Sequence, residues 1–121
     1  MNKEQASEIL RTIELAGRRV LPMHEFLAET NPRTLAAYNE FLNAAIYEDD
    51  ALDEAHKELV LACVCVAAGS SQPVIENHCR RALKAGIDKK ALLQALTIAA
   101  AVMATKSMGS GITALMEAAK E

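Results

Sequence analysis

Two stretches of this chain, residues 59–68 and 91–104, are apolar on nearly every face of a helix. A helix with that composition has to be covered by other protein on all sides. One small domain of 121 residues can hardly enclose two such helices by itself. We therefore expect copies of the chain to pack against one another and complete the burial, which predicts a homo-oligomer.

The apolar residues elsewhere recur at three-to-four spacing, and no stretch alternates as a strand would. The pattern predicts an all-α fold, a single-domain bundle of about six helices over residues 1–121. The predicted helices span residues 3–21, 32–47, 53–68, 72–85, 89–103 and 112–120.

Local signals set the expected helix boundaries. Pro22 is expected to interrupt the first helix, with only a short helical turn at residues 24–28 before the next one. Asn31 and Asp53 are suited to the N-cap position. The segment 106–111, with two Gly and two Ser, is expected to be a loose connection between the last two helices.

Charge and composition exclude several classes of function. The net charge is −3 and the basic residues are scattered, so nucleic-acid binding is not expected. The N-terminus has no apolar signal core, and the uncharged runs 59–75 and 91–105 fall short of a membrane span or contain polar residues. We expect a cytoplasmic protein without a membrane partner.

The three cysteines form an odd, irregular set that suits a reducing compartment, and no pair has zinc-site spacing. We therefore expect neither a metal nor another cofactor. Cys63 and Cys65 lie two residues apart on a helix and do not face each other, so they are interpreted as buried hydrophobes. Cys79 is interpreted as a core residue, with a reactive thiol as the alternative.

The residues most suited to chemistry bracket an uncharged stretch. No formal charge occurs between Glu58 and Glu76, so Glu58 and His78 are placed in apolar surroundings that perturb proton affinity. Glu58 is either a structural cap or ion-pair partner, or a proton-transfer group facing a pocket. His78 is either a boundary residue or an acid–base group. His24 and His56 are expected to be isolated and solvated.

The run ALDEAHKELVLACVCVAAG, followed by HCRRALKAGIDKKALLQALTIAAAV, resembles the carboxymuconolactone decarboxylase family, which includes the alkylhydroperoxidase D-like proteins. The resemblance covers a family core of about residues 31–105. It implies an all-helical subunit with the alkylhydroperoxidase D-like fold, assembled as a trimer, a hexamer or a related ring.

The redox branch of this family carries a Cys-x-x-Cys that precedes a histidine by four residues, and a glutamate further upstream. By this resemblance Glu58 matches the glutamate and His78 the histidine, while the cysteines would fall at Ser71 and Val74. Neither thiol is present. The chain is therefore more similar to the decarboxylase branch, and Ser71, at a helix N-terminus, becomes a candidate for binding a substrate carboxylate.

Three functions follow. The first is acid–base chemistry, a decarboxylation or isomerisation of a small carboxylic or lactone compound, with His78 as general acid–base and Glu58 as its partner. The second is an atypical thiol peroxidase-type oxidoreductase that uses Cys79. The third is a non-catalytic small-molecule-binding or scaffold oligomer, which predicts that Glu58 and His78 are fully occupied by structural hydrogen bonds with no adjoining cavity.

Overall fold

The computed structural model describes residues 1–121, which fold into helices without any strand. The predicted all-α class is confirmed. The chain forms two compact units, Met1–Asp50 and Ala51–Glu121, each of which is considered by itself.

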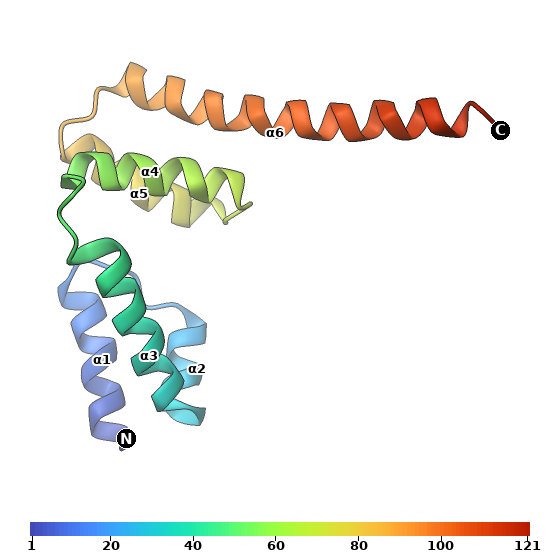
Figure 1. Ribbon diagram of the computed structural model, residues 1–121. Helices are drawn as coiled ribbons and strands as arrows, with labels where there is room; N and C mark the ends of the chain where they lie inside the picture. The colour runs from blue at the N-terminus through green and yellow to red at the C-terminus, as the bar shows by residue number, and fades with distance from the viewer. The chain divides into compact units, whose positions relative to one another are not determined.

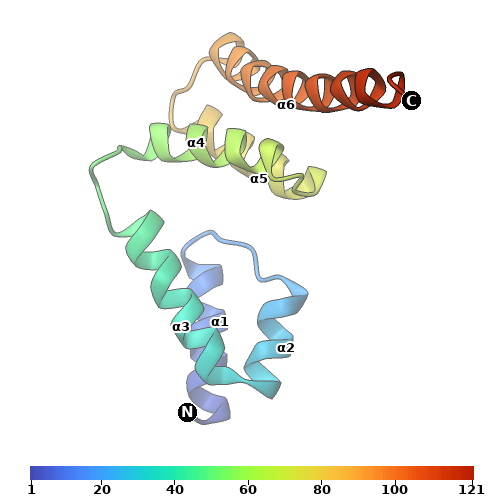
Figure 2. The ribbon, with the colours of Figure 1, turned by 45° about the vertical axis from the view of Figure 1, so that its right-hand side comes forward.

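The first unit consists of three α-helices and one π-helix (Figures 1 and 2). In chain order they are α1 (Lys3–Leu15), α2 (Pro22–Thr30), α3 (Pro32–Leu42) and the π-helix η1 (Asn43–Tyr47). Each of the three α-helices packs against the other two. The buried residues at their centre are Ala6, Ile13, His24 and Leu35.

The first helix is shorter than predicted and the second is longer. Helix α1 ends at Leu15, and Gly17 follows with φ +73°, a left-handed conformation that glycine adopts without steric cost. Pro22 then occupies the first position of the nine-residue helix α2, where its missing N–H leaves no bond unmade. Pro22 therefore begins a helix and does not end one.

The predicted helix over 32–47 is α-helical only as far as Leu42, and a five-residue π-helix begins at Asn43. Arg18 holds this segment from the α1–α2 connection. Its Nη1 donates to Oδ1 of Asn39 at 3.0 Å and to Oδ1 of Asn43 at 3.3 Å, and the guanidinium lies 4.7 Å from the centre of the Tyr47 ring. Arg18 thus joins the last turn of α3 to both ends of η1.

The second unit is a helical hairpin followed by one long helix (Figure 1). Helix α4 (Glu54–Ala67) and helix α5 (Gln72–Lys84) pack along each other, and helix α6 (Lys89–Ala118) begins against both. The Asp53 side chain accepts a hydrogen bond from the N–H of His56, so Asp53 is the N-cap of α4 as expected. The core is formed by Ala62, Ala82 and Leu92, flanked by Leu59, Cys79, Ile87 and Leu96.

Helix α6 contradicts the predicted break at 106–111, since it runs without interruption for 30 residues, a length of about 45 Å. A glycine inside a helix costs only about 1 kcal/mol relative to alanine. The long helix-forming runs on either side of Gly109 and Gly111 offset that cost.

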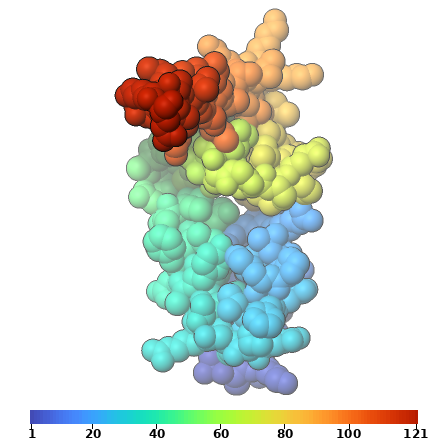
Figure 3. Space-filling model, turned by 90° about the vertical axis from the view of Figure 1, so that its right-hand side faces the viewer, coloured from blue at the N-terminus to red at the C-terminus, as the bar shows by residue number.

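Every residue after Ala100 is exposed in the chain alone, and in Figure 3 the last turns of α6 face the viewer. By length and composition α6 is also long and apolar enough to cross a membrane. The uncharged run 91–105 is only part of this helix, which continues through Lys106 and both glycines. A single helix of this kind is weak evidence for a span.

Candidate functional site

The hairpin of α4 and α5 brings Glu58 and His78 together. Ala62 follows Glu58 by one helical turn and Ala82 follows His78 by one turn, and both alanines are fully buried in the same core cluster. Small side chains at these two positions let the helices approach closely. The two functional side chains, 20 residues apart in sequence, therefore lie at hydrogen-bonding distance.

Glu58 is the centre of the site. Its Oε2 lies 2.9 Å from Nδ1 of His78, and its Oε1 accepts from Nε of Arg81 at 2.9 Å. The Glu58 side chain is only 3% exposed, against 15% for His78 and 23% for Arg81. A buried carboxylate is thus paired on one oxygen with a cation and on the other with an imidazole.

This arrangement fixes the position of the imidazole proton. An ionised carboxylate only accepts hydrogen bonds, so the proton of the His78 ring is on Nδ1, the nitrogen that faces Glu58. The other ring nitrogen, Nε2, has no hydrogen-bond partner within the chain. A neutral His78 therefore presents the Nε2 lone pair as a base, and its conjugate acid can return the proton.

Ser71 lies apart from this pair. It is the exposed N-cap residue of α5, its side chain makes no cap hydrogen bond, and its carbonyl accepts from the N–H of Val74 at 3.1 Å. Ser71 and His78 are two turns apart on the same face of α5, or roughly 10 Å by the helical rise. The structure does not bring Ser71 into contact with either His78 or Glu58.

The cysteines are free and partly buried. Burial raises the pKa of the Cys63 thiol, and burial together with the nearby Cys63 raises the pKa of Cys79. Cys79 packs against the core of Ala62, Ala82 and Leu92. A thiol with a raised pKa is a poor nucleophile at neutral pH, because the thiolate is the reactive form.

The two remaining histidines differ from each other. His56 is exposed as predicted, but it is not isolated, because its Nδ1 lies 2.7 Å from Oδ1 of Asp53. The prediction for His24 was wrong, because this ring is 3% exposed and lies 5.9 Å from the ring of Tyr38. Its Nδ1 accepts from the N–H of Leu21 at 2.9 Å.

The other nitrogen of His24, Nε2, is buried without a partner. Burial, and to a smaller extent the charge of Arg18, lowers the pKa of His24. A lowered pKa favours the neutral ring, and an Nδ1 that accepts a hydrogen bond carries no proton. The two observations are therefore consistent.

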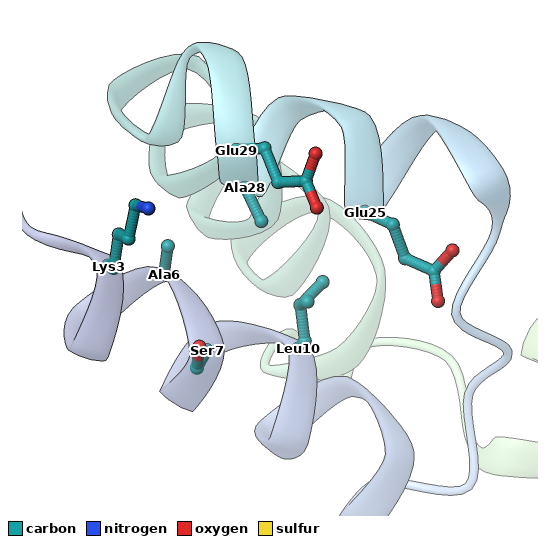
Figure 4. Close-up of a pocket in the computed structure, with 7 residues that line it drawn as sticks. All are labelled: Lys3, Ala6, Ser7, Leu10, Glu25, Ala28 and Glu29. Atoms are coloured by element: carbon teal, nitrogen blue, oxygen red, sulfur yellow. The ribbon is translucent and has the colours of Figure 1, made fainter.

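A hollow of about 840 Å³ opens on the first unit, between α1 and α2 (Figure 4). Its lining contains no imidazole and no thiol, so it is not formed by the predicted acid–base residues. The side chains around it are Lys3, Ala6, Ser7, Leu10, Glu25, Ala28 and Glu29.

Arg81 is the site residue that the sequence interpretation missed. The available signal was its spacing of three residues from His78, which makes the two side chains neighbours on a helix. What the spacing does not reveal is the shared partner, Glu58, which comes from another helix.

Comparison with known proteins identifies the family of this chain. The model of the Carboxymuconolactone decarboxylase family matches residues 32–120. No curated protein and no solved structure matched the chain. The matched region includes Glu58, Ser71, His78 and Arg81, and it contains no Cys-x-x-Cys sequence. Because the match extends over more than half of the chain, this protein belongs to the carboxymuconolactone decarboxylase family.

Proposed function

We propose that this protein is a decarboxylase-like enzyme that performs acid–base chemistry on a small carboxylic or lactone compound. His78 acts as the general acid–base and Glu58 as its partner. The observation that supports this proposal most is the 2.9 Å contact between a buried carboxylate and the imidazole Nδ1, with Nε2 left without a partner. That pairing is a recurrent way to orient a histidine for proton transfer.

The chemistry follows from the free nitrogen. In an isomerisation, Nε2 takes a proton from a carbon next to a carbonyl group, and the imidazolium returns it to a second carbon. In a decarboxylation, the bond to the carboxylate carbon breaks, carbon dioxide leaves, and the electron pair left on carbon takes a proton from the imidazolium. That imidazolium forms beforehand by uptake of a proton from water. In both reactions Glu58 stabilises the charged ring.

The substrate carboxylate is proposed to bind at the N-terminus of α5, at Ser71. The Ser71 hydroxyl is not used as a cap, and the helix dipole favours an anion there. Pro73 removes one backbone donor from the first turn, so the hydroxyl and the N–H of Gln72 carry more of the binding. A separation of roughly 10 Å from His78 suits an extended acid with its reactive carbon away from the carboxylate.

The test is an assay on unsaturated lactone acids, carboxymuconolactone among them, in deuterated buffer. Carbon dioxide release and deuterium incorporation, followed by NMR, report decarboxylation and isomerisation separately. His78→Gln and Glu58→Gln are expected to lower turnover by about 100-fold or more, and the exposed His56→Gln serves as the matched control. Unchanged turnover in the His78 variant would refute the proposal.

We propose further that the protein is a cytoplasmic homo-oligomer, a trimer or hexamer, in which copies of the chain cover α6. A bilayer is less suited to this helix because Lys106, Ser110, Thr113 and Glu117 recur on one face of it, and a charge at mid-helix is costly in lipid. Light scattering and membrane fractionation test this directly. A monodisperse monomer at micromolar concentration, or recovery in the membrane fraction, would contradict it.

A non-catalytic binding or scaffold oligomer is the second candidate. It is favoured by one observation, that both oxygens of Glu58 are already occupied by His78 and Arg81. It predicts that none of the acids is turned over. The thiol alternative with Cys79 is disfavoured by the raised pKa of this residue, and rapid labelling of Cys79 by a thiol reagent at pH 7 would restore it.

A further inference from the structure

Helix α2 begins without the side-chain oxygen that usually caps such an end. Its N-cap residue is Leu21, and Pro22 follows at the first helical position without an N–H. His24, in the third position, is bonded to Leu21 instead. Its Nδ1 accepts from the N–H of Leu21 at 2.9 Å, and its own N–H donates to the Leu21 carbonyl at 2.9 Å. The imidazole therefore supplies one of the two bonds that join Leu21 to His24.

A histidine makes this bond in only one of its protonation states. Glu or Gln is the usual residue at the third position of a capping box, and either one has an oxygen that accepts from the N-cap N–H. An imidazole accepts only while Nδ1 has no proton, because a protonated ring has two N–H donors and no acceptor. The bond from Leu21 to the ring of His24 is therefore lost when the ring is protonated.

The surroundings of His24 oppose a protonated ring in its present place. The residue is 3% exposed, its Nε2 is buried without a partner, and the Tyr38 ring of α3 lies 5.9 Å away. Arg18, in the connection from α1 to α2, adds to the effect of burial in lowering the pKa of His24. The other charged side chains of α1, α2, α3 and their connections are all exposed: Lys3, Glu4, Glu8, Arg11, Glu14, Arg19, Glu25, Glu29, Arg33 and Glu40. No buried carboxylate is therefore present in these helices to pair with an imidazolium.

We infer that His24 is an acid-sensitive switch at the start of α2: when Nδ1 gains a proton, the ring leaves its site, Leu21 is released, and residues 20–24 open while the rest of the first unit stays folded. The inference does not depend on the proposed acid–base function, whose residues belong to the second unit.

Other contacts limit the opening to this short segment. On its N-terminal side, Arg18 is bonded to Asn39 and Asn43, and neither bond involves the imidazole. At the centre of the unit, Ile13 and Leu35 are buried almost completely. These contacts remain when the ring moves, so the helices stay packed.

The proton balance determines how opening depends on pH. In the open conformation the ring is in water and titrates near its ordinary pKa of 6.5, whereas in the closed conformation the pKa of His24 is lower. Below pH 6.5 the open conformation binds a proton that the closed one does not. Each further decrease of one pH unit then favours opening by up to about tenfold, until the pH reaches the closed-state pKa.

The experiment is amide hydrogen exchange in the ¹⁵N-labelled full chain, followed by NMR between pH 5 and 7.5 and corrected for the intrinsic rate at each pH. The Leu21 amide reports the switch directly, because its partner is the ring. Its corrected rate is expected to rise by up to about tenfold per pH unit below pH 6.5. The Thr34 amide is the matched control, since it donates to Oδ1 of Asn31 at 3.2 Å, an acceptor that does not titrate. Its corrected rate should not depend on pH.

His24→Gln keeps an accepting oxygen for the Leu21 N–H but cannot gain a proton, so the corrected Leu21 rate is expected to become independent of pH. The exposed His56→Gln should keep the dependence of the parent. An unchanged pH dependence in His24→Gln would overturn the inference. If circular dichroism shows that this variant does not fold, the parent decides, and equal pH dependences of the Leu21 and Thr34 amides overturn the inference.

The amides of Ile13 and Leu35 separate local opening from unfolding of the whole unit, because buried central amides exchange only when the unit unfolds. Leu21 is expected to exchange at least about tenfold faster than either of them. Equal corrected rates at all three positions would show that the segment opens only by unfolding, which overturns the inference. A ¹⁵N-histidine spectrum above pH 7 that places the His24 proton on Nδ1 would also overturn it.

Discussion

Ala62 and Ala82 lie in one buried cluster, each four residues after a member of the Glu58–His78 pair. Their small size sets how closely α4 and α5 approach. The hydrogen bond between the carboxylate and the imidazole therefore depends on two residues that take no part in chemistry.

Ala82→Leu is expected to force the hairpin apart. Added volume in a filled core costs about 1–3 kcal/mol, and here it also lengthens the distance from Glu58 Oε2 to His78 Nδ1. Chemical denaturation measures the loss of stability, and the NMR signals of His78 report whether the Nδ1–H tautomer is lost. Ala67→Leu, an exposed position near the end of α4, is expected to change neither.

The first unit is expected to lose stability as the pH falls. Folding lowers the pKa of His24 below its ordinary value of 6.5, because the ring is buried and Arg18 is nearby. Below pH 6.5 the unfolded chain binds a proton that the folded unit does not, so the free energy of unfolding decreases. The decrease ends once the pH is below the folded-state pKa of His24.

Tyrosine fluorescence follows this unit selectively, because Tyr38 and Tyr47 are the only tyrosines and the chain has no tryptophan. Denaturation curves at pH 5 and pH 7.5 should therefore differ in the parent. His24→Gln is expected to remove most of that difference, while His56→Gln should preserve it. An equal difference in the His24 variant would show that other groups carry the pH dependence.

Arg18→Lys is expected to destabilise η1 although it keeps the charge. A lysine cannot bond to Asn39 and Asn43 together while lying flat on Tyr47. The expected loss is about 1–2 kcal/mol in denaturation monitored by tyrosine fluorescence. Arg19→Lys is the control, since Arg19 is exposed and adjacent. Equal stabilities for the two variants would contradict the role given to Arg18.

Ile112→Lys is expected to prevent assembly. Ile112 is an exposed apolar residue of α6, 53% accessible in the chain alone, and a charge there opposes burial against a second copy. Light scattering should show a fall in mass to that of the single chain. Ser110→Lys, on the face that already carries Lys106, should keep the parent mass.

Much of the fold was predictable because local signals decide it. Asn31 and Asp53 each accept a hydrogen bond from the N–H group three residues further on, as their positions predicted. The predicted end of the helix over 72–85 is close to the observed one, because Gly86, with φ +105°, follows α5 in the left-handed conformation that commonly ends a helix. These features depend on a few consecutive residues, which a sequence shows directly.

The wrong predictions have physical causes that a few consecutive residues do not reveal. The break expected at Gly109 and Gly111 failed because two glycines oppose a helix only weakly. The burial of His24 depends on α3, which supplies Tyr38. Within the site, Glu58 and His78 were identified from the apolar run and the resemblance to a family, whereas the role of Arg81 required knowing that α4 faces α5.

The large exposed surface of α6 has a consequence for the stability of the protein at low concentration. A helix that gains few contacts from its own chain is stabilised by mass action, in proportion to the supply of whatever covers it. If other copies cover it, the melting temperature of the protein will fall when the protein is diluted. A truncated copy expressed together with the full chain will then interfere with assembly. The fraction of the protein that is folded then depends on its expression level.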